Sequence, residues 1–159
     1  MCVDRPGRYV QVMADAGATR FIFQWEAVSA AEALTLARAI VDSGMKCGVS
    51  INPETHVQDL YPLLESGLFD LVDILAVHPG FGGQSFQDKA LDKVRQLSEW
   101  RGSKVFEIMV DGGINSETAA LAINAGADIL VAGTFLFQHP QGLAEGVKNL
   151  LGSEPITST

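Results

Sequence analysis

Cysteine and basic residues are both scarce in this sequence. The 159 residues include two cysteines, Cys2 and Cys47, which form no spaced pattern and so predict neither a disulfide framework nor a zinc site. Lys and Arg number 11 against 19 Asp and Glu, which gives a formal net charge of -8. This balance argues against nucleic acid or an anionic membrane as a partner, and we expect any bound phosphate group to be small.

Long apolar runs are missing as well. Residues 1–7 contain no apolar segment behind a basic start, and no later run approaches the roughly 18 apolar residues of a membrane helix. Together with the two unpatterned cysteines, this favours a reducing, cytoplasmic location without membrane contact. With 47% hydrophobic and 19% charged residues, the chain is long enough for one globular core and too short for two ordinary domains.

Five short apolar or β-branched runs are typical of buried strands. They occupy residues 20–25, 46–51, 71–77, 105–110 and 128–132. Segments with helical apolar spacing lie between them. Near-continuous apolar strands that alternate with helices predict an α/β fold with a parallel sheet covered on both faces, either a doubly wound sheet or a (β/α)8 barrel.

The boundaries of these elements support the alternation. Ser29 and Glu32 have the spacing of a capping box. Gly17, Gly44, Gly67 and Gly126 lie where the predicted helices end, and a glycine there can adopt the left-handed conformation that often terminates a helix. The strand starts are about 27 residues apart, so eight such units would need roughly 216 residues. The chain offers five strands, a helix at about residues 8–16 and a strand stub at residues 1–3, which leaves about a third of a barrel unaccounted for.

The strongest local motif is His78-Pro-Gly-Phe-Gly-Gly-Gln84, directly after the third apolar run. Three glycines in four positions permit positive φ angles, so backbone N–H groups can converge on an anion, and the next helix can add its positive N-terminal end. An arbitrary glycine-rich stretch is more often a flexible loop.

Two further glycine-bearing segments follow the next two strands. Asp111 precedes Gly112 and Gly113 after the fourth run, where a barrel strand would point it at the mouth, although an Asp-Gly pair is also common in turns. Gly133 and Thr134 follow the fifth run, where barrels often bind phosphate, although a tight turn would use the same residues. Three such loops on successive strand ends predict a phosphorylated small molecule at a barrel mouth.

The order PGFGGQ, then a strand ending in VDGGI, then VAGT before a helix resembles the ribulose-phosphate 3-epimerase family. The likeness extends along nearly the whole chain: residues 1–6 look like the end of the family's third strand, and residues 48–53 look like its fifth. The resemblance therefore implies an incomplete (β/α)8 TIM barrel, with the five strands as numbers four to eight. It implies a partial barrel domain over residues 1–151, whereas the polar, proline-containing composition of residues 152–159 predicts a flexible tail.

The resemblance also implies roles for single residues. Family members interconvert D-ribulose 5-phosphate and D-xylulose 5-phosphate in the pentose phosphate pathway by proton transfer at C3, assisted by a divalent metal such as Fe, Zn, Mn or Co. Asp111 matches the family's strand-seven aspartate, which is both an acid/base group and a metal ligand. The substrate-binding positions correspond to Gly80, Phe81, Gly82, Gly83, Asp111, Gly112, Gly113, Gly133 and Thr134.

Several family features have no counterpart in this sequence. The second catalytic aspartate and two histidine ligands come from the family's strands two and three, which no segment here matches, so we expect the metal to be weakly bound or absent. Gln24 stands where many members have His, Leu75 replaces a common Met, and His78 replaces Asn or Glu, whereas Glu26 agrees. A substitute ligand set that includes His56 and His78 is conceivable, but isolated histidines are usually structural.

Several functional hypotheses remain open at this point. The leading one is a ribulose-phosphate 3-epimerase of which this chain is a fragment or an alternative start; an epimerase of another ketose phosphate would share its loops. The alternative is a catalytically dead member that binds sugar phosphate or another chain without turnover. A lyase or synthase is disfavoured because Lys46 opens its strand, at the wrong end of a barrel. Unpaired sheet edges would also favour a homodimer.

Overall fold

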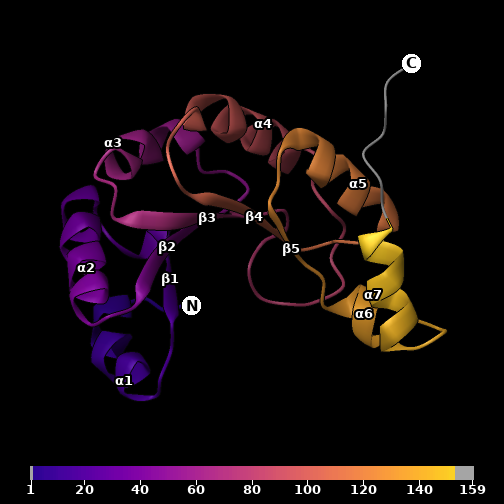
Figure 1. The fold of residues 1–159 in the computed structure, drawn as a ribbon, viewed down its shortest axis with the longest axis horizontal. Coiled ribbons are helices and arrows are strands. Elements are labelled where there is room, and N and C mark those ends of the chain that lie inside the picture. Colours follow the sequence, from indigo (N-terminus) through magenta and orange to yellow (C-terminus); the bar gives the residue numbers. More distant parts are fainter. Residues whose placement is uncertain (1, 153–159) are drawn as a thin grey trace.

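The computed structural model describes residues 2–152. Helices and strands alternate along the chain, with short 3-10 helices at three of the connections (Figure 1). The elements are η1 Pro6–Tyr9, α1 Val10–Asp15, β1 Arg20–Gln24, η2 Trp25–Ala27, α2 Ala30–Asp42, β2 Lys46–Ile51, η3 Val57–Leu60, α3 Tyr61–Leu64, β3 Phe69–Leu75, α4 Lys89–Arg101, β4 Glu107–Asp111, α5 Ser116–Ala125, β5 Ile129–Val131, α6 Thr134–Phe137 and α7 Leu143–Leu151.

The five strands form one parallel sheet in the order β1-β2-β3-β4-β5. All five predicted strands are therefore confirmed, with small shifts at their ends. The fourth begins at Glu107 rather than Val105, whose side chain is 93% exposed. The strand expected at residues 1–3 is absent at Cys2 and Val3, and Met1 lies outside the described residues.

The helices follow the convex side of a curved sheet, and Figure 1 shows no helix on the concave side in the part that the structure describes. The prediction of a sheet covered on both faces is thus wrong for residues 2–152. The convex face carries a row of paired, fully buried apolar side chains that packs against α2 and α4. This row is Phe23, Val49, Val72 and Ile108.

The concave face is more polar than a buried strand pattern predicts. The register there aligns Gln24 with Ser50, Ser50 with Asp73, and Asp73 with Met109. One step further toward the carboxyl ends, Leu75 aligns with Asp111. The mouth of the sheet therefore has a first layer that contains Asp111 and a layer beneath it that contains Asp73.

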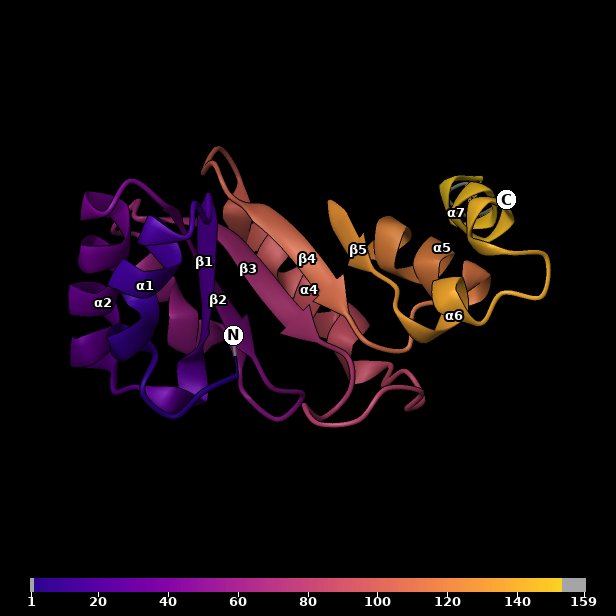
Figure 2. The same cartoon turned by 90° about the horizontal axis from the view of Figure 1, so that it is seen from below.

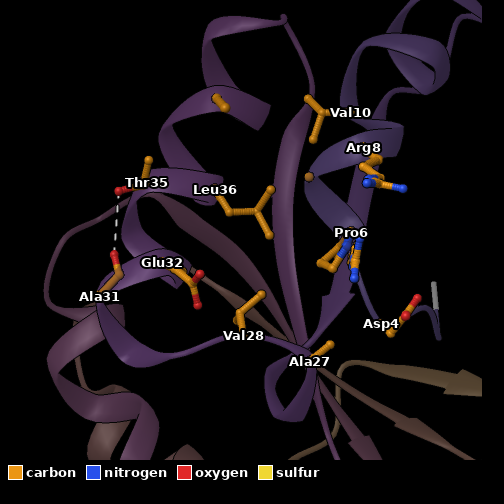
Figure 3. A pocket seen from close by; sticks show the side chains of 13 residues that line it. Asp4, Pro6, Arg8, Val10, Ala27, Val28, Ala31, Glu32, Thr35 and Leu36 are labelled. Atoms are coloured by element: carbon orange, nitrogen blue, oxygen red, sulfur yellow. Dashed lines mark hydrogen bonds between the residues drawn. The ribbon is translucent and has the colours of Figure 1, made fainter.

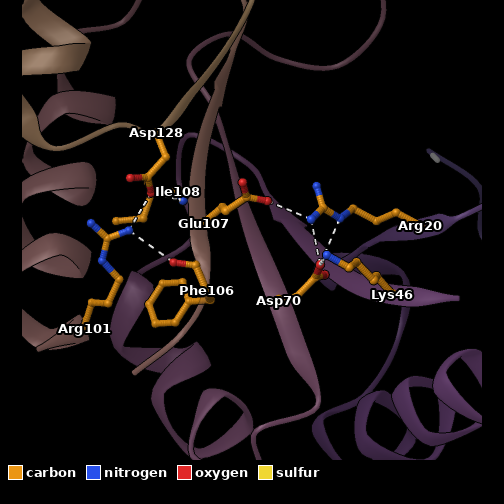
Figure 4. A network of polar contacts seen from close by, with 8 residues as sticks. All are labelled: Arg20, Lys46, Asp70, Arg101, Phe106, Glu107, Ile108 and Asp128. Atoms are coloured by element: carbon orange, nitrogen blue, oxygen red, sulfur yellow. Dashed lines mark hydrogen bonds and ion pairs between the residues drawn. The ribbon is translucent and has the colours of Figure 1, made fainter. Parts of the chain in front are cut away.

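An ion-pair network spans the amino ends of the strands (Figure 4). Arg20 on β1 donates to Asp70 on β3 at 2.6 Å and to Glu107 on β4 at 2.7 Å, so it reaches across β2. Lys46 adds a contact of 3.7 Å to Asp70. Lys46 thus lies at the amino end of the sheet, opposite the glycine loops, as the sequence predicts.

The helix boundaries follow the predicted local chemistry. The Ser29 hydroxyl accepts from the Glu32 N–H, and the Glu32 carboxylate accepts from the Ser29 N–H, which completes the capping box. The four glycines expected to end helices all have positive φ angles, as Gly126 does at +108°. The helix α7 ends at Leu151, and residues 153–159 of the expected tail lie outside the described residues. No helix within residues 2–152 is long and apolar enough to cross a membrane.

Candidate active site

The loops that follow β3, β4 and β5 meet at the carboxyl ends of the strands (Figure 2) and enclose a cavity of about 510 Å³. Every residue that the sequence analysis selected for catalysis or binding lines this cavity. They are Gly80, Phe81, Gly82, Gly83, Asp111, Gly112, Gly113, Gly133 and Thr134. The structure therefore brings together residues that lie on three separate loops, up to 54 positions apart.

Asp111 ends β4 and points its carboxylate into the mouth of the sheet. It is half-buried, and this burial raises the pKa of its carboxyl group. Its carboxylate makes no hydrogen bond or ion pair with residues 2–152, although its backbone carbonyl accepts from the Ala76 N–H at 2.8 Å. The N-cap of α5 is Asn115, whose side chain accepts from the N–H groups of Glu117 and Thr118. The capping role that the sequence left open for Asp111 is therefore filled by another residue.

Gly112 and Gly113 allow the loop after β4 to touch the loop after β3. Their φ angles are +106° and +65°. A Cβ on Gly112 would lie 2.4 Å from the side chain of Val77, and a Cβ on Gly113 would lie 2.6 Å from the backbone nitrogen of Phe86. Because both conformation and space exclude a side chain, this pair fixes how closely the two loops approach.

The loop after β3 is folded back on itself. Gly80 and Gly83 take φ angles of +145° and +79°, and Gly82 approaches the loop after β5, where its Cβ position would be 3.4 Å from the Thr134 hydroxyl. Phe81 is 87% exposed. Glycines from three loops thus leave backbone N–H groups accessible around one small space, as an anion requires.

Asp73 and Ser50 were missed by the sequence analysis. Asp73 is 6% exposed on the concave face; its Oδ2 accepts from the Ser50 hydroxyl at 2.7 Å, and its Oδ1 accepts from no donor within residues 2–152. Burial raises the pKa of Asp73 to about 7, the Ser50 hydrogen bond opposes this shift, and the charge of Asp111 adds to it. The signal was a single acidic residue inside the apolar run LVDILAV.

Polar side chains also link β1 to β2 beside the cavity. Gln24 donates to Glu26 at 2.6 Å and to Asn52 at 3.0 Å, and the Glu26 carboxylate accepts from the Asn52 N–H at 2.9 Å. Farther along the mouth, Glu54 pairs with Lys89 at 2.5 Å and lies 3.4 Å from His78. The polar groups of Gln24 and Glu26 are thus engaged in holding the two strand ends together.

The metal that the resemblance implies finds an incomplete ligand set. Residues 2–152 contain no cluster of three or more His, Cys, Asp or Glu side chains that could hold a metal ion. Asp111 belongs to no such cluster, and the His78 ring lies 3.4 Å from Glu54. The described residues do not fit a metal centre by themselves, since protein metal sites combine several ligands.

A second hollow, of about 690 Å³, lies between η1 and α2 (Figure 3). Pro6, Val10 and Leu36 form its apolar wall, and Arg8 and Glu32 lie at its rim. It contains none of the predicted site residues and lies on the outer, helical side of the sheet. The chemistry therefore points to the cavity at the strand ends.

The family model described as the ribulose-phosphate 3 epimerase family matches residues 1–137. This chain belongs to the ribulose-phosphate 3-epimerase family. It is 37% identical over 151 residues to the ribulose-phosphate 3-epimerase of Schizosaccharomyces pombe, covering 94% of this chain and 64% of that protein. It is 40% identical over 138 residues to the cytoplasmic isoform of Oryza sativa, covering 86% and 59%. The chain thus spans about three fifths of the length of these relatives.

Solved structures agree on the fold. Tryptophan synthase of Mycobacterium tuberculosis superposes with a TM-score of 0.64 at 18% identity, covering 92% of this chain and 56% of that chain. The structure described as native KDPGal gives 0.61 at 17% identity, covering 92% and 63%. Residues of this epimerase-family chain therefore adopt the parallel α/β arrangement found in TIM-barrel enzymes.

Proposed function

We propose that this chain is the phosphate-binding part of a ribulose-phosphate 3-epimerase, which interconverts D-ribulose 5-phosphate and D-xylulose 5-phosphate. Residues 1–151 form a partial barrel domain, and β1 to β5 correspond to barrel strands four to eight. The observation that carries the proposal is that all nine residues implied by the family resemblance line one cavity.

The phosphate group is held by backbone rather than by cationic side chains. The cavity is lined by no Lys or Arg among residues 2–152. The glycines of three loops bring N–H groups to the same space, and the Thr134 hydroxyl adds a donor near Gly82. N–H groups of this kind suit a phosphate monoester, because each donates a short, directed hydrogen bond to an oxyanion.

Asp111 takes the proton from C3 of the bound ketose phosphate. The electron pair of the broken C3–H bond moves toward C2, and the C2 carbonyl oxygen becomes an enediolate oxygen. Burial suits Asp111 to this task, because its raised pKa makes the carboxylate a stronger base than an exposed aspartate. Epimerisation also needs a proton on the opposite face, and no other Asp, Glu, Cys or His besides Cys2 and His78 lines the cavity within residues 2–152. No step is assigned to a metal, since the described residues do not fit one.

A second candidate function is binding without turnover. Asp111 is the one carboxylate that lines the cavity within residues 2–152, and this favours binding without turnover, because a single carboxylate can exchange a proton on one face but cannot invert C3 alone. Such a chain would bind a sugar phosphate or associate with another chain.

One NMR experiment separates the two candidates. D-ribulose 5-phosphate is incubated with the chain in D2O, with Mn²⁺ and separately with EDTA, and deuterium at C3, xylulose 5-phosphate and ligand line widths are followed. Turnover that falls at least about 100-fold in Asp111→Asn would establish the epimerase. Line broadening in the EDTA sample, where no paramagnetic Mn²⁺ reaches the ligand, without exchange or product in either sample would establish the binding function.

The matched control is Asp88→Asn. Asp88 precedes α4 and is exposed outside the cavity, so this substitution is expected to change neither binding nor turnover. Absence of any interaction between the wild-type chain and ribulose 5-phosphate would refute both candidate functions.

A further inference from the structure

The side chain of Gln84 ties the loop after β3 into a closed ring. Its Nε2 donates to the carbonyl oxygen of His78 at 2.7 Å and to the carbonyl oxygen of Phe81 at 2.8 Å. One amide group therefore joins the start, the tip and the end of the segment His78–Gln84. None of the roles assigned above uses this residue.

The second of these hydrogen bonds sets the direction of a neighbouring donor. The carbonyl of Phe81 and the N–H of Gly82 belong to the same trans peptide, in which C=O and N–H point in opposite directions. Because Phe81 O faces the Gln84 amide, the Gly82 N–H faces away from it. That N–H makes no hydrogen bond within residues 2–152, and Gly82 lines the cavity next to Thr134.

A glycine-rich loop would not keep this orientation unaided. Gly80, Gly82 and Gly83 can each populate both signs of φ, and fixing the backbone of each one costs conformational entropy. Two hydrogen bonds from one side chain, anchored at the end of the loop, reduce this freedom before a ligand arrives. A preorganised loop binds more tightly because less ordering is left to occur on binding.

We propose that Gln84 is a positioning residue of the anion site, whose amide holds the Phe81–Gly82 peptide so that the Gly82 N–H is presented to the phosphate group of the ligand. This inference rests on the proposed function. Gln84 itself need not touch the ligand, since it acts through the peptide that it holds.

The test replaces Gln84 by Met, which has a similar length and no donor. The matched control is Gln58→Met: the Gln58 amide donates to Gln96 at 2.6 Å, is exposed and does not line the cavity. Inorganic phosphate and D-ribulose 5-phosphate are titrated into each protein labelled with ¹⁵N-glycine. We expect Gln84→Met to raise the dissociation constant of both ligands at least 10-fold. The dissociation constants of Gln58→Met should stay within twofold of those of wild type.

Two further readouts separate positioning from a loss of structure. In the ligand-free protein, the Gly82 amide signal should shift in Gln84→Met while that of Gly126, at the end of α5, stays in place. Gln84→Ala should weaken the binding of phosphate to the same extent as Gln84→Met, because it removes the same donor.

Unchanged affinity in Gln84→Met, with wild type binding phosphate normally, would overturn the inference and leave the proposed function intact. A wild-type chain that binds neither ligand would overturn both. A Gly82 signal that does not move would overturn the inference whatever the affinities are.

Discussion

Asp73 should make this chain less stable as pH rises from about 4 to about 7. Its pKa is about 7 in the folded chain against an ordinary value of 3.8, because the carboxyl group is buried and lies near the charge of Asp111. Below pH 3.8 both the folded and the unfolded chain carry the proton, so ionisation of Asp73 does not lower the stability of the fold. As pH rises, the unfolded chain releases its proton first and is thereby stabilised; above pH 7 both states are ionised and the effect is constant.

The size of this effect follows from the shift. About three pKa units correspond to about 4 kcal/mol, a large part of the 5–15 kcal/mol by which a domain of this size is usually stable. Replacing Asp73 by Asn keeps the shape and the acceptor for the Ser50 hydroxyl but removes the ionisation. The free energy of unfolding of Asp73→Asn, taken relative to that of wild type, should therefore rise by about 4 kcal/mol between pH 4 and pH 8.

Urea unfolding of both proteins at pH 4, 5.5, 7 and 8 measures this difference directly. Asp42→Asn, at the exposed end of α2, is the control and should keep the pH slope of wild type. If the difference between Asp73→Asn and wild type stayed constant from pH 4 to pH 8, the carboxyl group would not be buried as described and the reasoning would fail.

Two further substitutions test the contacts that shape the sheet and its mouth. Gly113→Ala should destabilise the chain by at least about 2 kcal/mol more than Gly17→Ala in thermal unfolding. Both glycines have positive φ angles, but only at Gly113 would a Cβ press against the backbone of Phe86. Equal losses of stability in the two variants would contradict this reasoning. Arg20→Met should lower the free energy of unfolding by about 1 kcal/mol in low salt and by less in 1 M NaCl. The control Arg95→Met breaks a single exposed pair within α4 and should change the free energy of unfolding little. A loss for Arg20→Met that does not depend on salt would mean that packing rather than charge is involved.

The strands were predictable because each is a short, mostly apolar run, and on the convex face the residues that pair across the strands are apolar as well. All five runs begin within two residues of the strands that the structure shows. The last strand is only Ile129–Val131, shorter than the predicted run, since its outer edge pairs with nothing among residues 2–152. Helix ends were predictable for a local reason: caps such as Ser29 with Glu32 act over three residues.

Contacts between distant residues could not be predicted in this way. Arg20 and Glu107 are 87 positions apart, and nothing near either residue indicates the other. Asp73 was not selected as a site residue for a related reason. An apolar run is recognised from the average hydrophobicity of its residues, so one acidic residue within it is overlooked. Whether such a residue points to a core or to a site depends on which face of which strand carries it, and that is fixed by register.

The sequence proposed the residues of the candidate site one by one, and they line one cavity, but it did not indicate how the loops that carry them are braced. The motif around Gly82 indicated an anion-binding loop only because glycine frees the backbone, and freedom alone does not orient a donor. Orientation comes from side chains such as Gln84, whose bonds to His78 and Phe81 exist only once the loop has closed. A glycine motif therefore identifies where backbone donors can converge, and the residues that brace it decide whether they do.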